Sequence, residues 1–328
     1  MFKTISRTLF LAALAWSGAA QCQTQQAQPG DSSKAVVFVV PFAAGSGTDQ
    51  ITRILTSKMG ERMGKAIVVE NKPGANGQIG SLNVARAQPD GHTLLVATVS
   101  THAANRYLFK ELQYDPIKDF SPIGRITLNP LALLVRADSA FNSVGDLIEF
   151  ARKNPGKLSY GHSNAGSQVS TAMLLHKSEV EALAVPYKST PQTFTDLVAG
   201  RIDFAISDFS PARALVQAEK LKVLAVTSLS RFHMIPDVPA VSETKGMEDY
   251  SFHAWLGLMA PAGTPPDIVS MLNAELRVAL EDPAIRSQLE QNTGSIIEPT
   301  TVDEFVAFMH DQDQLWRTQV ELAGIQPE

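Results

Sequence analysis

Two glycine-rich turns are the parts of this sequence most suited to binding chemistry. The first, residues 41–49 (PFAAGSGTD), follows a run of β-branched residues and precedes a helical pattern. Glycines let backbone N–H groups point inward, and a helix N-terminus adds about half a positive charge, so such a turn can hold an anion. No Gly-Lys-Ser/Thr follows, and Gln50 stands where a dinucleotide fingerprint needs its third glycine. The alternative is a tight turn that binds nothing.

Within this turn, Phe42 is placed to line a pocket, because it lies two residues past the strand. Asp49 or Thr48 is expected to cap the following helix, and Asp49 has ligand binding as its other possible role. The candidate ligand-binding residues of the turn are Phe42, Ala43, Ala44, Gly45, Ser46, Gly47, Thr48 and Asp49.

The second turn lies at residues 161–168 (GHSNAGSQ) and resembles a nucleophile elbow, which holds a serine on a sharp strand-to-helix turn. A serine hydrolase built on Ser163 needs an acid and a histidine later in the chain. That order is met by Asp203, Asp208 or Asp237 with His253 or His310. However, Ala165 replaces the second glycine of the elbow, and nothing like HGGG precedes it. A loop that binds an anion or a hydroxyl group is the other interpretation.

The sequence lacks the residue patterns that usually bind metals or cofactors. The seven histidines form no HxH or HExxH pattern, so the sequence predicts no metal site and no cofactor. His102, just after a strand end, is the histidine that we place nearest a cleft. Asp208 follows another strand and is a candidate to bond a ligand. Trp255 is assigned to the core rather than to ligand stacking.

Composition indicates a soluble globular protein. Of 328 residues, 44% are hydrophobic and 19% are charged, and the length suits about two domains. The net charge is -5 and no basic run occurs, which argues against a nucleic-acid partner. The single cysteine, Cys22, excludes a disulfide scaffold and a zinc site built on cysteines.

The N-terminus has the pattern of a signal peptide. Lys3 and Arg7 precede a short apolar core at residues 9–16, and small residues follow at 17–20. Cleavage after Ala20 or Cys22 fits, so we assign residues 1–22 to the signal peptide and 23–33 to a disordered leader. A lipid-anchored Cys22 is the alternative, but a lipobox has a small residue where Gln21 stands. We therefore expect export to the periplasm.

Strand patterns alternate with helical patterns, which predicts an α/β protein with a mostly parallel sheet. The expected strands are residues 36–40, 66–70, 93–97, 131–135, 158–160, 182–186, 202–206, 221–226 and 253–259. The expected helices are residues 51–63, 79–87, 144–154, 169–177, 190–199, 265–280, 284–291 and 302–322. Both glycine-rich turns connect a strand to a helix, and ligands of open α/β sheets bind beyond such strand ends. Two series of this kind predict a cleft between two lobes.

The sequence resembles the Bug family of periplasmic solute-binding receptors, which are associated with tripartite tricarboxylate transporters. The resemblance covers about residues 34–324. It is carried by PFAAGSGTDQITR, VVENKPGANGQIG, PDGHTLLVATVSTHAAN, NPGKLSYG, VPYKSTPQTFTDLVAGRIDFAI, LKVLAVTS, PDVPAVSE and WLGLMAPAGTP. The sequence departs from the family pattern at Ser46, which stands in a run that is often all glycine, and at Ser170 and Ser189, where the family often has His and Gly.

The resemblance implies a type II periplasmic binding protein, a two-lobed Venus flytrap with two connecting strands. Lobe 1 would take residues 34–128 plus 232–328, and lobe 2 residues 129–231. The family implies binding of a small organic acid, without catalysis, for delivery to a tripartite transporter; a sensor kinase of a two-component system is the alternative partner. We expect a monomer. Carried onto this sequence, the remaining ligand-site residues are Ser100, Thr101 and His102 at the mouth of the cleft, then Ser163, Asn164, Ala165, Gly166, Ser167, Gln168, Tyr187 and Asp208.

Overall fold

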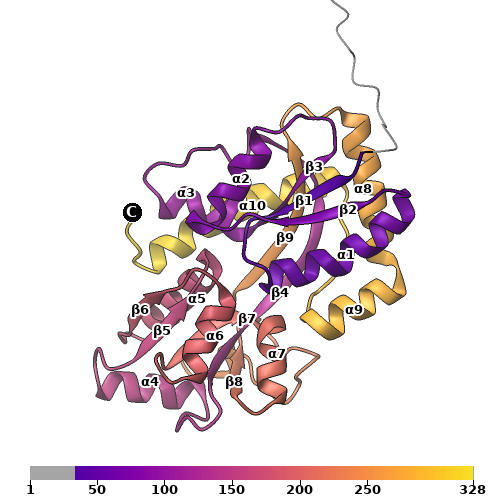
Figure 1. Ribbon diagram of the computed structural model, residues 1–328. Coiled ribbons are helices and arrows are strands. Elements are labelled where there is room, and N and C mark those ends of the chain that lie inside the picture. Colours follow the sequence, from indigo (N-terminus) through magenta and orange to yellow (C-terminus); the bar gives the residue numbers. More distant parts are fainter. Residues whose placement is uncertain (1–33, 328) are drawn as a thin grey trace, which may run out of the picture.

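The computed structural model describes residues 34–327 and folds them into two lobes joined by a long central strand (Figure 1). The expected signal peptide and leader lie outside the described residues. The strands follow the order β2-β1-β3-β9-β4-β7-β5-β6, and β8 pairs with β4 off this path. Strand β4 (Phe120–Arg136) pairs with β9 (His253–Pro261) along its first part, and with β7 (Phe204–Asp208) and β8 (Leu221–Val226) along its last. One strand therefore belongs to both lobes.

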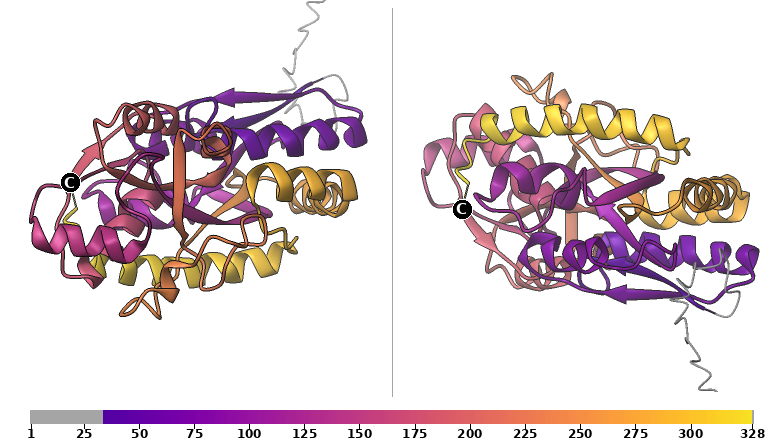
Figure 2. Two further views of the ribbon diagram at one scale, coloured as in Figure 1. Left: turned by 90° about the horizontal axis from the view of Figure 1, so that it is seen from below. Right: turned by 90° about the horizontal axis from the view of Figure 1, so that it is seen from above.

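The first lobe is built on β1 (Val36–Val40), β2 (Ile67–Asn71) and β3 (Thr93–Thr98), with β9 and the start of β4 beside them. Figure 2 shows α1 (Gly47–Met63) and α10 (Val302–Leu322) on opposite sides of this sheet. The remaining helices of this lobe are η1 (Ala75–Gly77), α2 (Gln78–Ala85), η2 (Ser100–Ala104), α3 (Asn105–Leu108), α8 (Pro266–Glu281) and α9 (Pro283–Thr293). Both faces of the sheet are thus covered, which buries the apolar strands.

The second lobe is built on β5 (Ser159–His162), β6 (Leu183–Pro186) and β7, with β8 and the end of β4. Its helices are α4 (Val144–Lys153), α5 (Ala165–Lys177), α6 (Thr190–Val198) and α7 (Phe209–Gln217). A short 3₁₀ helix, η3 (Val241–Glu243), lies in the connection from β8 to β9.

The second connection between the lobes is organised around Thr227. Strands β8 and β9 follow each other along β4, because Val226 pairs with Ala132 and His253 pairs with Pro130. Between them the chain leaves β4 at Thr227 and returns at Phe252. Thr227 Oγ1 accepts a hydrogen bond from Leu131 N (2.7 Å) and donates one to Phe252 O (2.8 Å). This buried threonine ties the two crossings together.

Strand direction differs between the outside and the centre of the sheet. The pairs β1–β2, β1–β3, β5–β6 and β5–β7 are parallel, as the strand–helix alternation predicts. All pairs made by β4 or β9 are antiparallel. The first part of β4 was not expected as a strand, because Pro122, Gly124 and Pro130 interrupt its apolar pattern. The helices α3 and α7 were not expected either.

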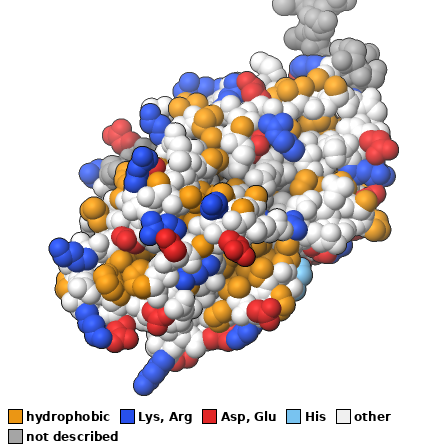
Figure 3. All heavy atoms as spheres, turned by 60° about the horizontal axis from the view of Figure 1, so that its bottom comes forward, with side chains coloured by type: hydrophobic (Ala, Val, Ile, Leu, Met, Phe, Trp, Pro, Cys, Tyr) orange, Lys and Arg blue, Asp and Glu red, His pale blue; other side chains and the backbone are white. Residues whose placement is uncertain are grey.

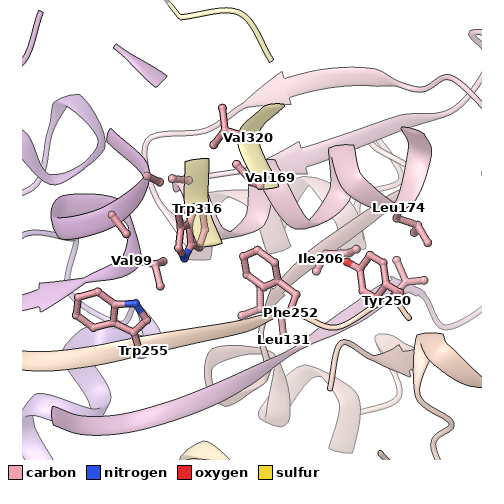
Figure 4. Close-up of a cluster of buried hydrophobic side chains, with 14 of the residues drawn as sticks. Val99, Leu131, Val169, Leu174, Ile206, Tyr250, Phe252, Trp255, Trp316 and Val320 are labelled. Carbon is pink, nitrogen blue, oxygen red and sulfur yellow. The ribbon is translucent and has the colours of Figure 1, made fainter. Parts of the chain in front are cut away.

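A hydrophobic cluster joins the C-terminal helix to both lobes. Trp316 and Val320 of α10 lie with Val169 of α5 and with Phe252 (Figure 4). The rings of Phe252 and Trp316 meet edge to face, with centroids 5.3 Å apart. Helix α10 thus packs against the second lobe as well as the first. Its apolar contacts support the sheet on the side that α10 covers.

Candidate functional site

The first glycine-rich turn leads into the start of α1, which faces the second lobe. Ser46 is the N-cap, with its Oγ accepting from Asp49 N at 3.3 Å, so the expected caps Thr48 and Asp49 both lie inside the helix. Gly45 has the left-handed φ of +80°, whereas Gly47 has no positive φ. Gly47 is needed for space instead, because a Cβ there would lie 2.9 Å from Asp208 Cγ.

Asp49 holds the first turn in place through hydrogen bonds to its carboxylate. Its carboxylate accepts hydrogen bonds from Gly45 N (2.9 Å), from Asn71 Nδ2 (2.9 Å) and from Arg53 Nε (3.0 Å). Burial alone would raise the pKa of Asp49, but the hydrogen bonds from Arg53, Gly45 and Asn71 outweigh burial and lower the pKa. The carboxylate is therefore ionised, and its hydrogen bonds are already made within the protein.

The second glycine-rich turn forms the corresponding helix start in the second lobe. Asn164 caps α5 and forms a capping box with Ser167, so α5 begins at Ala165, four residues before the expected start. Ala165 N donates to Ser100 Oγ (3.2 Å) and to Asn76 Oδ1 (3.1 Å), both from the first lobe. Side chains of one lobe thus meet the helix N-terminus of the other.

The two helix starts line one cavity of about 30 Å³ between the lobes. Its walls are Phe42, Gly47, Thr48, Ile51, Thr98, Val99, Ser100, Asn129, Leu131, Asn164, Gly166, Ser167, Ser207, Asp208, Ala254, Trp255 and Leu256. Within residues 34–327, no protein oxygen accepts a hydrogen bond from the N–H groups of Gly47, Thr48 or Gly166. No lysine or arginine stands among these wall residues.

Three further polar groups of the cavity wall lack a protein partner among the described residues. Ser207 and Trp255 are buried, and neither Ser207 Oγ nor Trp255 Nε1 makes a hydrogen bond. Figure 4 shows the indole nitrogen on the edge of Trp255 toward Val99, which lines the same cavity. Asp208 keeps part of its surface accessible, and burial raises the pKa of its carboxyl to about 6. Orphaned polar groups of this kind point to an interaction that the chain alone does not supply.

The structure separates the expected site residues into three groups. Phe42, Gly47, Thr48, Ser100, Asn164, Gly166, Ser167 and Asp208 line the cavity. Ser163, Gln168 and Tyr187 line a neighbouring hollow of about 260 Å³, which Asn164 shares. The third group lines neither of these: Ala43, Ala44, Gly45, Ser46, Asp49, Ala165, Thr101 and His102. Ala165 still contributes its N–H between the lobes.

Thr101 and His102 belong to the interior of the first lobe instead of the mouth of the cleft. The His102 ring lies edge to face with Phe120, with centroids 4.6 Å apart, and its Nδ1 contacts Thr101 Oγ1 at 2.9 Å. Burial lowers the pKa of His102 to about 3, so the ring is neutral.

Several cavity residues were missed by sequence reasoning. Trp255 packs in the core, as predicted, but it also lines the cavity, and Ser207 and Asn129 were not singled out at all. Ser207 had a usable signal, because it precedes Asp208 at the end of a strand. Asn129 had none, since its place depends on the unexpected first part of β4.

Among residues 34–327, no catalytic triad forms around Ser163. Its Oγ lies 3.0 Å from Thr190 Oγ1, and no histidine hydrogen-bonds to it in residues 34–327. The Asp203 carboxylate accepts hydrogen bonds from Ser159 N and Ser159 Oγ, so it is engaged with Ser159 and not with a triad at Ser163. In the described part of the chain, no group of three or more His, Cys, Asp or Glu residues could hold a metal ion. No helix there is long and apolar enough to cross a membrane.

Comparison with known families connects this geometry to a protein class. Residues 51–324 match the tripartite tricarboxylate transporter family receptor. The chain belongs to this receptor family. The matched region contains most of the cavity wall, including α1 after its first turn, α5 and the end of β7.

Individual relatives of the receptor cover nearly all of its described length. A UPF0065 protein encoded in the tcbD–tcbE intergenic region of Pseudomonas sp. (strain P51) is 36% identical over 88% of this chain and 86% of its own. The solved structure of the periplasmic binding protein BugD is 32% identical, with a TM-score of 0.84 over 90% of this chain and 99% of BugD. The resemblance to Bug receptors and the two-lobed binding-protein fold are thereby confirmed.

Two further solved structures contain acids. Rpa4515 of R. palustris, solved with adipate, is 30% identical and has a TM-score of 0.87, covering 90% of this chain and 99% of that protein. MatC (Rpa3494) from Rhodopseudomonas palustris, with bound malate, is 31% identical and has a TM-score of 0.82, covering 88% and 99%. The receptor's relatives thus include proteins with dicarboxylates bound.

Proposed function

We propose that this receptor binds a small organic acid in the cavity between its lobes, held by the starts of α1 and α5. The observation that carries the proposal is that Gly47, Thr48 and Gly166, from two lobes, line one cavity, and that no protein oxygen of residues 34–327 accepts a hydrogen bond from their N–H groups. Each helix N-terminus stabilises an anion by about 0.3–1 kcal/mol, in addition to charge-assisted hydrogen bonds. The acids bound to Rpa4515 and MatC support this choice of ligand class.

Attraction of an anion must be local in this protein. The full chain has a net charge of -5, and Figure 3 shows acidic and basic side chains interspersed over one face without a basic patch. Long-range steering therefore favours no anion. Inside the cavity, where little water screens the charges, amide dipoles interact with a carboxylate more strongly than they do in water.

Binding requires the lobes to move. A cavity of about 30 Å³ has room for about one water molecule and is too small for a dicarboxylic acid. Contacts between the lobes hold it shut: Ala165 N bonds Ser100 and Asn76, and Ser210 Oγ bonds Gln50 Oε1. We infer that the lobes open about the crossing at Thr227, and that a ligand touching both lobes favours the closed state.

The finer assignments complete the proposal. As the resemblance implies, residues 34–128 plus 232–328 are assigned to lobe 1 and residues 129–231 to lobe 2, except that Phe232 and Ala240 pack in the core of lobe 2, so the chain re-enters lobe 1 only after the second crossing at Phe252. The receptor acts without catalysis, as a monomer in the periplasm, and delivers its ligand to the membrane subunits of a tripartite transporter; delivery to a sensor kinase is the alternative. Of the expected site residues, those lining the cavity contact the ligand, and Asp49 and Ser46 position the first turn.

A thermal-shift screen of mono-, di- and aromatic carboxylates on purified protein tests the proposal. A ligand at 100 times its Kd adds about 2.7 kcal/mol of stability, which raises Tm measurably. Isothermal titration calorimetry then gives Kd. A complete screen in which no carboxylate raises Tm or releases heat would contradict the proposed function.

Two parts of the proposal have tests of their own. Labelling of Ser163 by a fluorophosphonate probe would support the serine-hydrolase alternative and contradict a purely binding role. Intact-mass analysis of periplasmic material should show a chain that begins at Gln21 or Gln23. A mature form that keeps Met1 would refute cleavage of the signal peptide.

A further inference from the structure

Two side chains of the first lobe meet the first N–H group of α5 in the second lobe. Ala165 is the first residue of that helix, since Asn164 is its N-cap, and an N–H at this position has no partner within its own helix. Ala165 N donates to Asn76 Oδ1 (3.1 Å) and to Ser100 Oγ (3.2 Å). Because the donor and the acceptors belong to different lobes, these hydrogen bonds form only when the lobes are closed.

The first lobe orients Asn76 for this contact in advance. Asn76 Nδ2 donates to Asn105 Oδ1 (2.9 Å), and Asn105 Nδ2 donates to Asn76 O (3.1 Å), so one buried side chain fixes both the backbone and the amide of Asn76. Asn76 has the left-handed φ of +52°, which asparagine tolerates better than most residues do. With Nδ2 bonded to Asn105, the side chain presents Oδ1 to Ala165. The acceptor therefore needs little ordering when the lobes close.

The contact at Ala165 is more buried than another contact between the lobes. Ala165 is 0% and Ser100 is 1% exposed, whereas Arg213 of α7 donates to Gln291 O and to Asn292 Oδ1 at an exposed position. A hydrogen bond away from water is electrostatically stronger than an exposed one. Ala165 lines neither the cavity nor the neighbouring hollow, so a ligand in the cavity leaves its hydrogen bonds in place.

We propose that Asn76 and Ser100 form a latch that favours closure of the lobes through Ala165 without help from a ligand. Every atom of the latch belongs to the protein, so its hydrogen bonds form whether or not an acid occupies the cavity. The latch supplies part of the free energy of closure, and a ligand has to supply only the remainder. This inference rests on the proposed function, because it concerns closure of the lobes around that ligand site.

Double electron–electron resonance between two spin labels tests the latch in ligand-free protein. Cys22→Ser removes the single native cysteine, and Asn83→Cys on α2 and Gln192→Cys on α6, both at exposed positions, then place one label on each lobe. We expect part of the wild-type population to show the short distance of the closed state. The double variant Asn76→Gly/Ser100→Ala should lower the ratio of closed to open molecules by about threefold to tenfold, which is the effect of one hydrogen bond.

Two further variants make this result specific. Glu219→Gly is the matched control, because Glu219 also has a left-handed φ of +52° but is exposed in the second lobe. It should leave the ratio unchanged. Ala165→Pro removes the donor from the second lobe, at the helix position where proline is favoured and after a residue, Asn164, whose extended backbone is compatible with a following proline. It should lower the ratio at least as much as the double variant does.

The outcomes distinguish this inference from the proposed function, because the distance measurement needs no ligand. An unchanged ratio in the folded variants, with folding verified by circular dichroism, would overturn the latch and leave acid binding intact. Ligand-free wild-type protein that shows only the long distance, or a shift of the same size in Glu219→Gly, would overturn the latch as well. A carboxylate screen without a hit would contradict the proposed function, while the distances would still report on the latch.

Discussion

Gly47→Val should weaken ligand binding while leaving each lobe folded. A Cβ at Gly47 would lie 2.9 Å from Asp208 Cγ and 3.0 Å from Asp208 Cβ, about 0.5–1 Å closer than ordinary van der Waals contact. The two methyl groups of valine extend further. Because Gly47 and Asp208 belong to different lobes, the collision exists only when the lobes are closed, and opening relieves it.

The size of the effect follows from this geometry. Overpacking of a tight site costs about 1–3 kcal/mol. If the closed state alone bears that cost, affinity falls by about tenfold at 1.4 kcal/mol and by more than about a hundredfold at 3 kcal/mol. Gly47 has no positive φ, so backbone strain contributes nothing to the estimate.

Calorimetric titration with the best ligand of the screen measures the loss, and circular dichroism confirms the fold of the variant. Gly145→Val is the matched control. Gly145 also lies in the first turn of a helix and has no positive φ, but a Cβ there meets only Ser143 Oγ, at 3.5 Å. A folded Gly47→Val protein with wild-type affinity would remove the first turn from the binding site and refute the reasoning.

Three other variants test separate parts of the structure. Ser163→Ala removes the hydroxyl contact to Thr190 and should lower the unfolding free energy by about 0.5–1.5 kcal/mol. Its loss of ligand affinity should be smaller than that of Gly47→Val. A larger loss of affinity, measured by calorimetry, would place Ser163 in the ligand site. Asp208→Asn should raise Tm at pH 7.5 but not at pH 4. Burial raises the pKa of Asp208 from 3.8 to about 6, so its contribution to stability is full below pH 4 and is lost as pH rises through 6, by up to about 3 kcal/mol. An equal Tm change at both pH values would contradict this. Thr227→Val deletes the hydroxyl that bonds both Leu131 N and Phe252 O and should lower the unfolding free energy by about 1–3 kcal/mol. An unchanged midpoint of urea denaturation would show that the connection between the lobes does not depend on this hydroxyl.

The sequence determined the local features of this receptor. Five β-branched or aromatic residues in a row specified β1, and the change from that run to glycines and then to helical spacing located the turn before α1. The same sequence of signals located the turn before α5, although Asn164 and Ser167 start that helix earlier than its apolar spacing suggested. The motifs along the chain also identified the receptor family, and the strand–helix order predicted its two-lobed fold.

Only the tertiary structure decided which of these residues meet. Asp49 and Asp208 look alike in the sequence, since each follows a strand closely. In the fold, Asn71 and Arg53 donate hydrogen bonds to the carboxylate of Asp49. Asp208 lines the cavity, and its carboxylate accepts no hydrogen bond from residues 34–327. The roles of Ser207 and Trp255 also depend on β7 and β9 lying on either side of β4. Hydrogen-bond satisfaction and burial depend on groups that are far apart in the chain, and no local pattern of residue types records those contacts.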